Sequence, residues 1–333
     1  MRRREFVAAL AAGLTWSLAA RAQQSNSRRL AIFSPSESSA LMHEHSENRY
    51  YRILFEELRR LGWIEGQNLV VEAYGREQYT SGPDILATDI VRRNPDVIYT
   101  IGPGSISFKS ATSRIPVVAL TGDPVALGMA QSLAHSGTNF TGVSIDTGPS
   151  IHGKRIGLLR EMVPAISKLG CLALRIQWSG PIVGPAVRAA AEKVGLPLVE
   201  SQYEFGASER DYRSAIEIVA HGGANAILVL DSPDVFRNSA LLARLVGEYK
   251  LPSMFTFVEP VEAGGLMAYS FDLVELYKRA ANNIDAILRG TRPSDIPFYQ
   301  ASNFQLSINL KAAKQLGISA PPALIASADK IID

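Results

Sequence analysis

Short apolar runs alternate with amphipathic stretches along this chain, and the alternation predicts its architecture. Residues 97–101 and 115–120 form two such runs, each too short for a buried helix, rich in β-branched residues and followed by turn residues. Between them, residues 105–112 can form one short helix. A strand, a helix and a second strand in this order imply a parallel sheet with helices on both of its faces.

The same alternation extends over most of the chain. We expect further strands at residues 30–33, 69–73, 140–145, 171–176, 198–203, 226–230, 253–257, 265–270 and 304–308. We expect further helices at residues 50–61, 85–93, 153–162, 185–194, 209–221, 237–249, 272–288 and 310–316. The pattern restarts near residue 153, so it predicts an α/β protein with two Rossmann-like lobes. The helix at 272–288 follows two complete lobes, which indicates that the chain crosses back to the first.

The beginning of the chain has the pattern of an export signal. Arginines at positions 2–4 precede a mostly apolar run at residues 6–20, and Ala20-Arg21-Ala22 is a small-x-small cleavage site. The apolar run is shorter than the roughly 20 residues of a membrane-spanning helix. We therefore expect residues 1–22 to be a signal peptide and the mature protein to be periplasmic. The arginine pair at positions 3–4 also resembles a twin-arginine signal, so the export route stays open.

Charge and cysteine content narrow the classes of partner. The formal net charge is +2, and removal of residues 1–22, with their four arginines and one glutamate, makes it −1. This near balance gives no indication of a nucleic-acid or membrane-surface partner. Cys171 is the one cysteine and lies in an apolar run, which favours a buried thiol over a nucleophile or a metal ligand. Stability must then come from packing, for which 47% hydrophobic residues supply enough apolar surface.

Two polar loops follow neighbouring strands of the predicted sheet. Gly102-Pro103-Gly104-Ser105 opens a helix after the first strand, and Thr121-Gly122-Asp123-Pro124 follows the second. Glycines let the backbone approach a ligand, and the N–H groups that begin a helix favour an oxygen atom. The carboxyl ends of parallel strands are where open α/β sheets bind small molecules, although ordinary turns would read the same way. The first loop is no dinucleotide fingerprint, because Ser107 stands where a third glycine is needed.

Motifs of catalysis and metal binding are scarce. His43-Glu44-His45 places two histidines at i and i+2, where they share a face only in extended structure, so a solvated loop is favoured over a metal site. The chain has no G-x-S-x-G, H-E-x-x-H or P-loop motif, and its five histidines show no triad-like grouping. We expect no catalytic residue, no metal and no cofactor.

Several longer segments together carry a family resemblance. They are Leu61-Gly62-Trp63-Ile64-Glu65-Gly66-Gln67-Asn68-Leu69, Asp123-Pro124-Val125-Ala126-Leu127-Gly128, Asn139-Phe140-Thr141-Gly142-Val143-Ser144, Lys154-Arg155, Glu262-Ala263-Gly264-Gly265-Leu266-Met267-Ala268-Tyr269, and Ile308-Asn309-Leu310-Lys311-Ala312-Ala313-Lys314. Each is weak alone, but their combination over nearly the whole mature chain is specific. The chain resembles the ABC-transporter substrate-binding proteins, a family that includes binders of tryptophan and other aromatic amino acids.

The resemblance implies a type I periplasmic-binding-protein fold with three crossovers between the lobes and a ligand held in the cleft between them. The expected division is residues 28–142 plus 268–298 for the first lobe, and 143–267 plus 299–333 for the second. It implies a monomer that delivers a small molecule to a membrane permease and its ATPase, with no chemistry of its own. A sensory module that reports to a receptor would have the same fold, so the sequence leaves that alternative open. A two-lobed α/β enzyme is disfavoured by the absent motifs.

The chain departs from the family pattern at two strand ends. Arg175-Ile176-Gln177-Trp178 stands where similar proteins usually have Asn-Pro, and Asp231-Ser232-Pro233 replaces Pro-Asp-Pro. The shifted acidic residue puts an α-amino-acid ligand in doubt. Our hypothesis is that Arg175 pairs with a ligand carboxylate and that Trp178 supplies an aromatic wall, unless Arg175 points to solvent.

We therefore expect an aromatic or carboxylate-bearing ligand, amino-acid-like or not, at the strand ends of both lobes. The expected ligand-binding residues are Ser34, Ser36, Gly104, Ser105, Thr121, Asp123, Arg175, Trp178, Asp231, Ser232, Thr256, Phe257 and Tyr269. Tyr269 lies on an expected hinge strand, where a structural role is equally compatible. Lys154 and Arg155 are expected to be surface or interlobe charges rather than ligand contacts.

Overall fold

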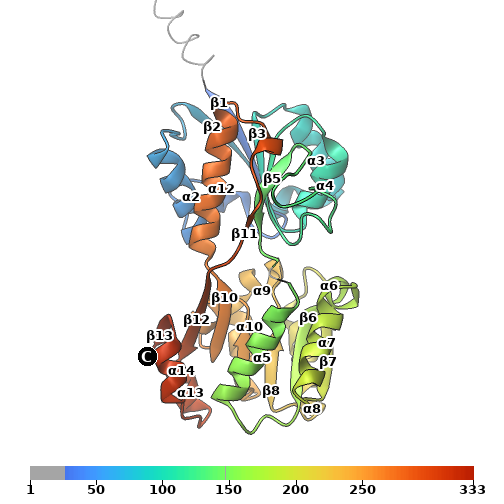
Figure 1. The fold of residues 1–333 in the computed structure, drawn as a ribbon, viewed down its shortest axis with the longest axis vertical. Helices are drawn as coiled ribbons and strands as arrows, with labels where there is room; N and C mark the ends of the chain where they lie inside the picture. The colour runs from blue at the N-terminus through green and yellow to red at the C-terminus, as the bar shows by residue number, and fades with distance from the viewer. Residues whose placement is uncertain (1–26, 147) are drawn as a thin grey trace, which may run out of the picture. The chain divides into compact units, whose positions relative to one another are not determined.

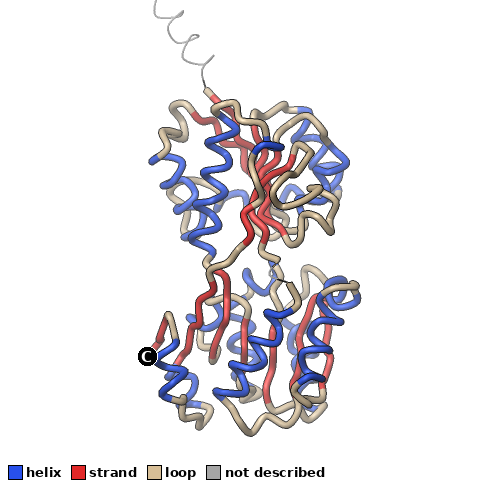
Figure 2. The backbone as a smooth tube through the Cα atoms, viewed as in Figure 1, coloured by secondary structure: helices blue, strands red, loops and turns tan. Residues whose placement is uncertain are grey.

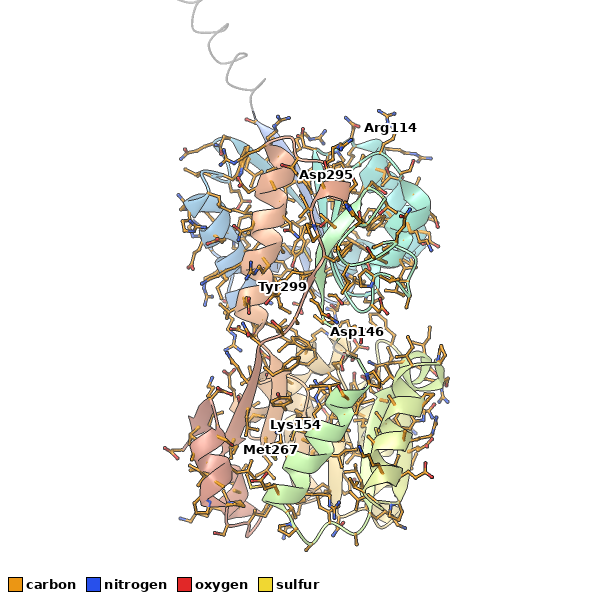
Figure 3. The ribbon with its side chains drawn as sticks, in the orientation of Figure 1. Arg114, Asp146, Lys154, Met267, Asp295 and Tyr299 are labelled. Carbon is orange, nitrogen blue, oxygen red and sulfur yellow. The ribbon has the colours of Figure 1, made fainter. Side chains whose placement is uncertain are left out.

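The computed structural model describes residues 27–146 and 148–333, so the expected signal peptide lies outside the described residues. These residues divide into two compact α/β units. Unit 1 takes the chain up to Ser144 and again Val274–Tyr299, and unit 2 takes Ile145–Leu273 and Gln300–Asp333. The chain therefore passes from one unit to the other three times, as the fold prediction required (Figure 1). Asp146 and Tyr299, both labelled in Figure 3, stand beside the first and third of these crossings.

Unit 1 is built on a six-stranded sheet, whose strands are coloured red in Figure 2. Its strands are β1 (Arg28–Phe33), β2 (Leu69–Tyr74), β3 (Val97–Ile101), β4 (Val117–Thr121), β5 (Phe140–Ser144) and β11 (Tyr299–Gln300). They lie in the order β11-β5-β4-β3-β1-β2, and β1 to β5 pair in parallel. The short apolar runs of the sequence are these strands, which are buried because helices cover both faces.

Four α-helices cover the sheet of unit 1. They are α2 (Arg49–Arg60), α3 (Pro83–Arg92), α4 (Gly104–Ala111) and α12 (Leu273–Leu288), with short 3-10 turns η1 (Ser39–Leu41), η2 (Arg76–Ser81) and η3 (Pro293–Asp295). Helices α2 and α12 lie on one face and α3 and α4 on the other (Figure 1). Helix α2 begins where the Asn48 side chain accepts a hydrogen bond from the Tyr50 N–H, and the chain turns away at Gly62, which has φ +97°.

Residues 61–69, one of the segments that carry the family resemblance, stabilise the structure of unit 1. The Trp63 indole N–H donates to Asp285 Oδ1 of α12 at 2.7 Å. The Asn68 side chain accepts from the Ile64 N–H at 2.7 Å and donates to the Gly62 carbonyl at 2.8 Å. These bonds shape the loop after α2 and fasten it to α12, which explains the motif without a ligand.

Unit 2 has a seven-stranded sheet in the order β13-β12-β10-β9-β8-β6-β7. Its strands are β6 (Leu169–Leu174), β7 (Leu198–Tyr203), β8 (Ala226–Val229), β9 (Ser253–Phe255), β10 (Met267–Phe271), β12 (Phe304–Asn309) and β13 (Lys330–Ile332). The helices are α5 (Ser150–Met162), α6 (Arg175–Ser179), α7 (Val183–Lys193), α8 (Glu209–His221), α9 (Pro233–Arg237), α10 (Ser239–Glu248), α11 (Glu259–Glu262), α13 (Leu310–Gln315) and α14 (Pro322–Ser327). Strand β12 is antiparallel to β10, and the strands from β7 to β10 are parallel.

The core of unit 2 lies between the sheet and the helices α5, α7, α13 and α14. Cys171 is buried in this core, and burial raises the pKa of its thiol far above the ordinary range. The expectation of a buried cysteine is thus confirmed, and its thiol is protonated and inert at neutral pH. Among the described residues, no helix is long and apolar enough to cross a membrane.

The structure corrects two expectations. Residues 268–273 lie in unit 2, because β10 pairs with β9 and β12 there, whereas we expected 268–298 to belong to the first lobe. The expected strand 171–176 ends at Leu174, and Arg175 begins the short helix α6. The first error concerns the pairing of β10, which the sequence pattern does not reveal. The second concerns the edge of a strand, where the apolar Ile176 continues the strand pattern although the backbone has already turned.

Candidate functional site

Each sheet has one point where the strand order reverses. In unit 1 the strand β1 lies between β2 and β3, and in unit 2 the strand β6 lies between β7 and β8. The connections from such a pair of strands leave in opposite directions, so the carboxyl ends of the strands border an open space there. Most of the expected ligand residues follow β1, β3, β6 or β8, so the topology places them at these two points.

In unit 1 the strand ends carry buried hydroxyl groups. Ser34 and Ser36 follow β1, and their Oγ atoms are 3.3 Å apart. Ser105, at the start of α4, has its Oγ 3.2 Å from Thr121 Oγ1 and donates to the Gly102 carbonyl at 2.8 Å. Four of the residues expected to bind the ligand thus lie at one edge of the sheet of unit 1. They offer uncharged hydrogen-bond donors and acceptors.

Gly104 is needed for close packing at this edge. A Cβ atom there would lie 2.6 Å from the Phe33 ring, so only glycine lets α4 begin this close to β1. Pro103 precedes the helix and has no side chain that accepts a hydrogen bond from it. Backbone carbonyls serve part of this helix start instead, since the Ser105 and Ile106 N–H groups donate to the Gly102 and Pro103 carbonyls, each at 3.2 Å.

Asp123 has a local partner already. Its Oδ1 accepts hydrogen bonds from the N–H groups of Val125 and Ala126, at 2.8 and 3.1 Å, and so holds the turn after β4. Ser144, at the end of β5, was not foreseen; its Oγ donates to the Gly122 carbonyl at 2.9 Å. Both side chains shape the strand-end loops of unit 1.

Arg175 begins α6 and binds groups of the neighbouring strand β7. Its Nε pairs with the Glu204 carboxylate, and its Nη1 donates to Gln202 Oε1 at 3.1 Å. These residues border a shallow hollow of about 400 Å³ between β7 and α8. Since the guanidinium already has a carboxylate partner, its pairing with a ligand stays a prediction that would require an exchange of partners.

Trp178 lies in the core of unit 2 with 2% of its surface exposed. Its indole N–H donates to Glu200 Oε2 at 2.8 Å, and the Arg188 guanidinium lies over its ring at 4.7 Å. Arg188 also donates two hydrogen bonds to Glu200, and these hold the pKa of Glu200 below its ordinary value. This placement supports packing against α7 and the sheet rather than contact with a solute.

Asp231 and Ser232 follow β8 at the reversal point of unit 2. The Ser232 side chain accepts from the Val235 N–H at 3.0 Å, capping α9, and lies 2.7 Å from the Tyr203 hydroxyl. The Asp231 backbone carbonyl accepts from the Gln177 amide at 3.0 Å. The Ser232 hydroxyl is therefore already bonded. The Asp231 carboxylate, by contrast, makes no hydrogen bond or ion pair with any of the described residues.

Two expected residues follow β9. Thr256 is fully buried, and its Oγ1 has no hydrogen-bond partner in the described part of the chain. Phe257 forms an aromatic row with Phe236 and Phe271, with edge-to-face centroid distances of 5.5 and 5.7 Å. Phe257 and Phe271 are buried, so the row packs aromatic side chains beside the polar groups at this end of the sheet. Tyr269, on β10, stacks on Phe304 at 5.4 Å, which is a packing contact within unit 2.

Two residues of α5 were missed as candidates. Arg155 is only 2% exposed, and its Nε donates to the Tyr269 carbonyl at 3.0 Å. His152, one helical turn earlier, is 6% exposed, and its Nδ1 has no partner among the described residues. By contrast Lys154, labelled in Figure 3, is exposed. Arg155 and His152 lie on the apolar side of α5, with Ile156.

Burial sets the charges of these two residues. It lowers the pKa of Arg155 to about 10, while the negative charge of Asp231 acts in the opposite direction, so Arg155 stays cationic at neutral pH. Burial and then the charge of Arg155 lower the pKa of His152 to about 4, so the imidazole is neutral. Cationic Arg155, the neutral imidazole of His152 and the carboxylate of Asp231 thus act on one another near the end of β8.

The charged side chains at His43-Glu44-His45 do not form a metal centre. Glu44 pairs with Arg59, and His45 Nε2 lies 3.3 Å from Glu44 Oε1. In the described part of the chain, no group of three or more histidine, cysteine, aspartate or glutamate side chains is placed to hold a metal ion.

Comparison with known families decides the identity of the chain. The sequence model of the family described as "ABC transporter substrate binding protein" matches residues 42–332. The chain belongs to this family. Comparison with curated proteins gives no match. Members of the family bind a substrate for an ABC transporter and are typically periplasmic, so a solute-binding role is the one that the fold and the family share.

Solved structures agree with this assignment. A conserved domain protein from Vibrio cholerae is 25% identical, with a TM-score of 0.79, over 92% of this chain and 99% of that one. An ABC domain from Streptococcus pneumoniae, in complex with L-Trp, is 21% identical with the same TM-score over 92% of this chain and 100% of that one. A ligand-free substrate-binding protein with adhesive properties from Clostridium difficile is 20% identical with a TM-score of 0.65, over 92% and 99% of the two chains. The last two likenesses show the fold alone.

Proposed function

We propose that this substrate-binding protein is the exported solute-binding component of an ABC importer, and that it holds one small solute without altering it. The family match over residues 42–332 is the observation that carries the proposal. Residues 1–22 would direct export, and the mature monomer would deliver its solute to a membrane permease with its ATPase.

In each unit, the side chains at the carboxyl ends of the strands support a solute-binding role. Unit 1 offers the buried hydroxyls of Ser34, Ser36, Ser105 and Thr121. Unit 2 offers the carboxylate of Asp231, which has no hydrogen bond or ion pair within the described residues, and the aromatic row around Phe257. Uncharged hydrogen-bonding groups on unit 1, and a carboxylate beside aromatic side chains on unit 2, are each of the kinds that bind small polar or aromatic solutes. Since one structural neighbour is a complex with L-Trp, aromatic acids are the first solutes to test.

A thermal-shift screen of the mature chain tests this function. The panel contains aromatic acids, amino acids, short carboxylates and sugar alcohols. A solute that binds the folded protein alone raises its stability by about 2.7 kcal/mol at a concentration 100 times the Kd. We expect at least one class of solute to raise the melting temperature and calorimetry to give a saturable isotherm.

Mass spectrometry of the bound solute separates binding from catalysis. We expect the solute to be recovered with its mass unchanged after long incubation. Conversion to a product would contradict the proposal in favour of an enzyme. A panel in which no member changes the melting temperature would count against a solute-binding role.

A further inference from the structure

Unit 2 buries the guanidinium of Arg155, which forms no ion pair among the described residues. Arg155 is 2% exposed, and its only hydrogen bond in the described part of the chain runs from Nε to the Tyr269 carbonyl. The two Nη groups have no partner there. Removing an arginine from water without a carboxylate partner is unfavourable by several kcal/mol, so such residues are usually paired.

Asp231 is close to Arg155 without pairing with it. The carboxylate is near enough to favour the charged form of Arg155, but no ion pair or hydrogen bond joins the two side chains in the described structure. The Asp231 carboxylate also accepts no hydrogen bond from any residue that the structure describes. A cation and an anion therefore lie within electrostatic range, each with unused hydrogen-bonding capacity.

Other polar groups with unused capacity surround this pair. Thr256 Oγ1, His152 Nδ1 and Gln177 Oε1 are buried and have no partner among the described residues. In the sheet, Val229 pairs with Phe255 and Ala268 also pairs with Phe255, so the residue after Phe255 lies between the ends of β8 and β10. Thr256 is on the same face as Met254, which packs in the core beneath α5.

The position of α5 brings its two residues to the same place. Helix α5 leads into β6, so its first turns lie at the carboxyl ends of the strands, as Figure 1 shows. His152 and Arg155 lie one turn apart on its buried side. The Arg155 bond to the Tyr269 carbonyl fixes the guanidinium at the end of β10. Five polar residues from four segments thus lie at one edge of the sheet: His152 and Arg155 of α5, Gln177 of α6, Asp231 after β8 and Thr256 after β9.

We infer that Arg155, and not Arg175, anchors the carboxylate of the solute, and that Asp231 accepts a hydrogen bond from a donor group of the same solute. A planar guanidinium donates two parallel hydrogen bonds to a carboxylate, and the buried site strengthens them. Thr256 and neutral His152 supply further hydrogen bonds to the carboxylate oxygens. The inference rests on the proposed function and specifies its solute class: a carboxylic acid that also carries a hydroxyl, amine or N–H group.

Acid and amide pairs test the inference because they differ by one charge at nearly constant shape. Calorimetry at pH 7.5 compares L-tryptophan with L-tryptophanamide, indole-3-acetate with indole-3-acetamide, and phenyllactate with phenyllactamide. The wild-type protein should bind the acid of at least one pair at least tenfold more tightly than its amide. Arg155→Met should weaken binding of that acid by about 30-fold or more and leave the amide within about threefold.

Two further variants separate the anchor from general effects. Arg160→Met alters an exposed arginine on the same helix, which donates to the Val194 carbonyl, and should leave all affinities unchanged. Arg155→Lys keeps the charge but not the planar pair of donors, so it should restore part of the preference for the acid. If Arg155→Met does not fold, Arg155→Lys and the acid–amide comparison in the wild type still decide the question.

The outcomes distinguish this inference from the function on which it rests. Equal binding of acids and amides, or binding of amines or sugar alcohols alone, would overturn the carboxylate anchor and leave the solute-binding function intact. An equal loss of acid and amide affinity in Arg155→Met would also overturn the carboxylate anchor, because an arginine with a purely structural role would affect both ligands alike. Chemical conversion of a bound probe would instead overturn the proposed function.

Discussion

The imidazole of His152 is buried next to a buried cation, and this makes it sensitive to acid. Protonation of His152 would place a second positive charge beside Arg155, and the opposing charge of Asp231 has a smaller effect on His152 than burial and Arg155 have. The folded protein therefore keeps His152 neutral down to a pKa of about 4, below the ordinary value of 6.5. Since the unfolded chain binds that proton more readily, the stability that neutral His152 contributes is fully present above about pH 6.5 and is lost as the pH falls towards 4.

His152→Gln should reduce the loss of stability in acid. The folded and unfolded pKa values of His152 differ enough for the wild type to lose about 2 kcal/mol more than the variant between pH 7 and pH 4.5. Urea unfolding of both proteins at the two pH values measures this difference. The carboxylates titrate alike in both proteins, so their effect cancels. Parallel stability curves would show that His152 does not carry this acid sensitivity.

The polar residues at strand ends differ in how far the sequence could predict them. Ser34, Ser105 and Thr121 follow strongly apolar strands, so their place at one edge of unit 1 follows from parallel topology. Arg155 could not be placed in the same way, because Lys154 and Arg155 look alike as adjacent charges. Its position on the apolar side of α5 was a signal, but a long charged side chain there can also extend along the apolar surface and keep its charged end in water. Only the fold shows that its guanidinium is enclosed.

At the scale of the elements, the pairing of β4 with β5 depends on one glycine. Gly142 has φ +147° and pairs with Ala119, and a Cβ atom there would lie 2.0 Å from the Ala119 carbonyl oxygen. Its own carbonyl accepts a hydrogen bond from Asn283 of α12 at 3.3 Å. The family segment around Gly142 thus serves the close approach of two strands and a helix.

Gly142→Ala should lower the free energy of unfolding by about 3 kcal/mol, from backbone strain and overpacking. Gly157→Ala is the matched control, because Gly157 lies within α5 and has no atom within 4 Å of an added Cβ. That change should stabilise the protein by up to about 1 kcal/mol, since alanine favours a helix more than glycine does. Denaturant unfolding of both variants measures the two effects. Equal stability of Gly142→Ala and the wild type would mean that β5 can shift away from β4.

The long elements were predictable because burial imposes a period on them. The strand 198–203 and the helix 209–221 have the expected bounds, and the helix begins with a capping box between Ser208 and Asp211 that is legible in the sequence. The short helices α6, α9 and α11 were not predicted as elements. Each has only four or five residues, which is too few to show a helical period. Arg175 illustrates the consequence: it begins a helix although we expected it within a strand.

For the whole molecule, the sequence indicated the return of the chain after the second lobe but not where it occurs. The pattern of β10 is that of any buried strand, and only its pairing with β9 and β12 assigns it to unit 2. Unit 1 is therefore completed by a segment that follows most of unit 2 in the chain. Tyr277 of α12 joins this late segment to the rest of unit 1. Its ring contacts those of Tyr50, Tyr51 and Tyr99, at centroid distances of 5.3, 6.0 and 6.2 Å.

Tyr277→Ala should destabilise unit 1 by about 3–5 kcal/mol, because it leaves a cavity among buried aromatic rings. Hydrogen exchange followed by mass spectrometry can locate the effect. Peptides of β1, β3 and α2 should exchange faster, whereas peptides of β6 and β8 should be unchanged, because local stability follows the packing of each unit.

A matching substitution in unit 2 tests the division into units independently of Tyr277→Ala in unit 1. Tyr212 is buried in unit 2, with its ring 5.0 Å from that of Tyr203, so Tyr212→Ala should accelerate exchange in β6, β7 and β8 and spare unit 1. If either substitution accelerates exchange equally in both units, the chain unfolds as one cooperative body. In that case the three crossings would transmit stability between the units, and a solute that contacts unit 2 alone would also protect unit 1. Exchange confined to the altered unit would mean that a solute must contact both units to protect both.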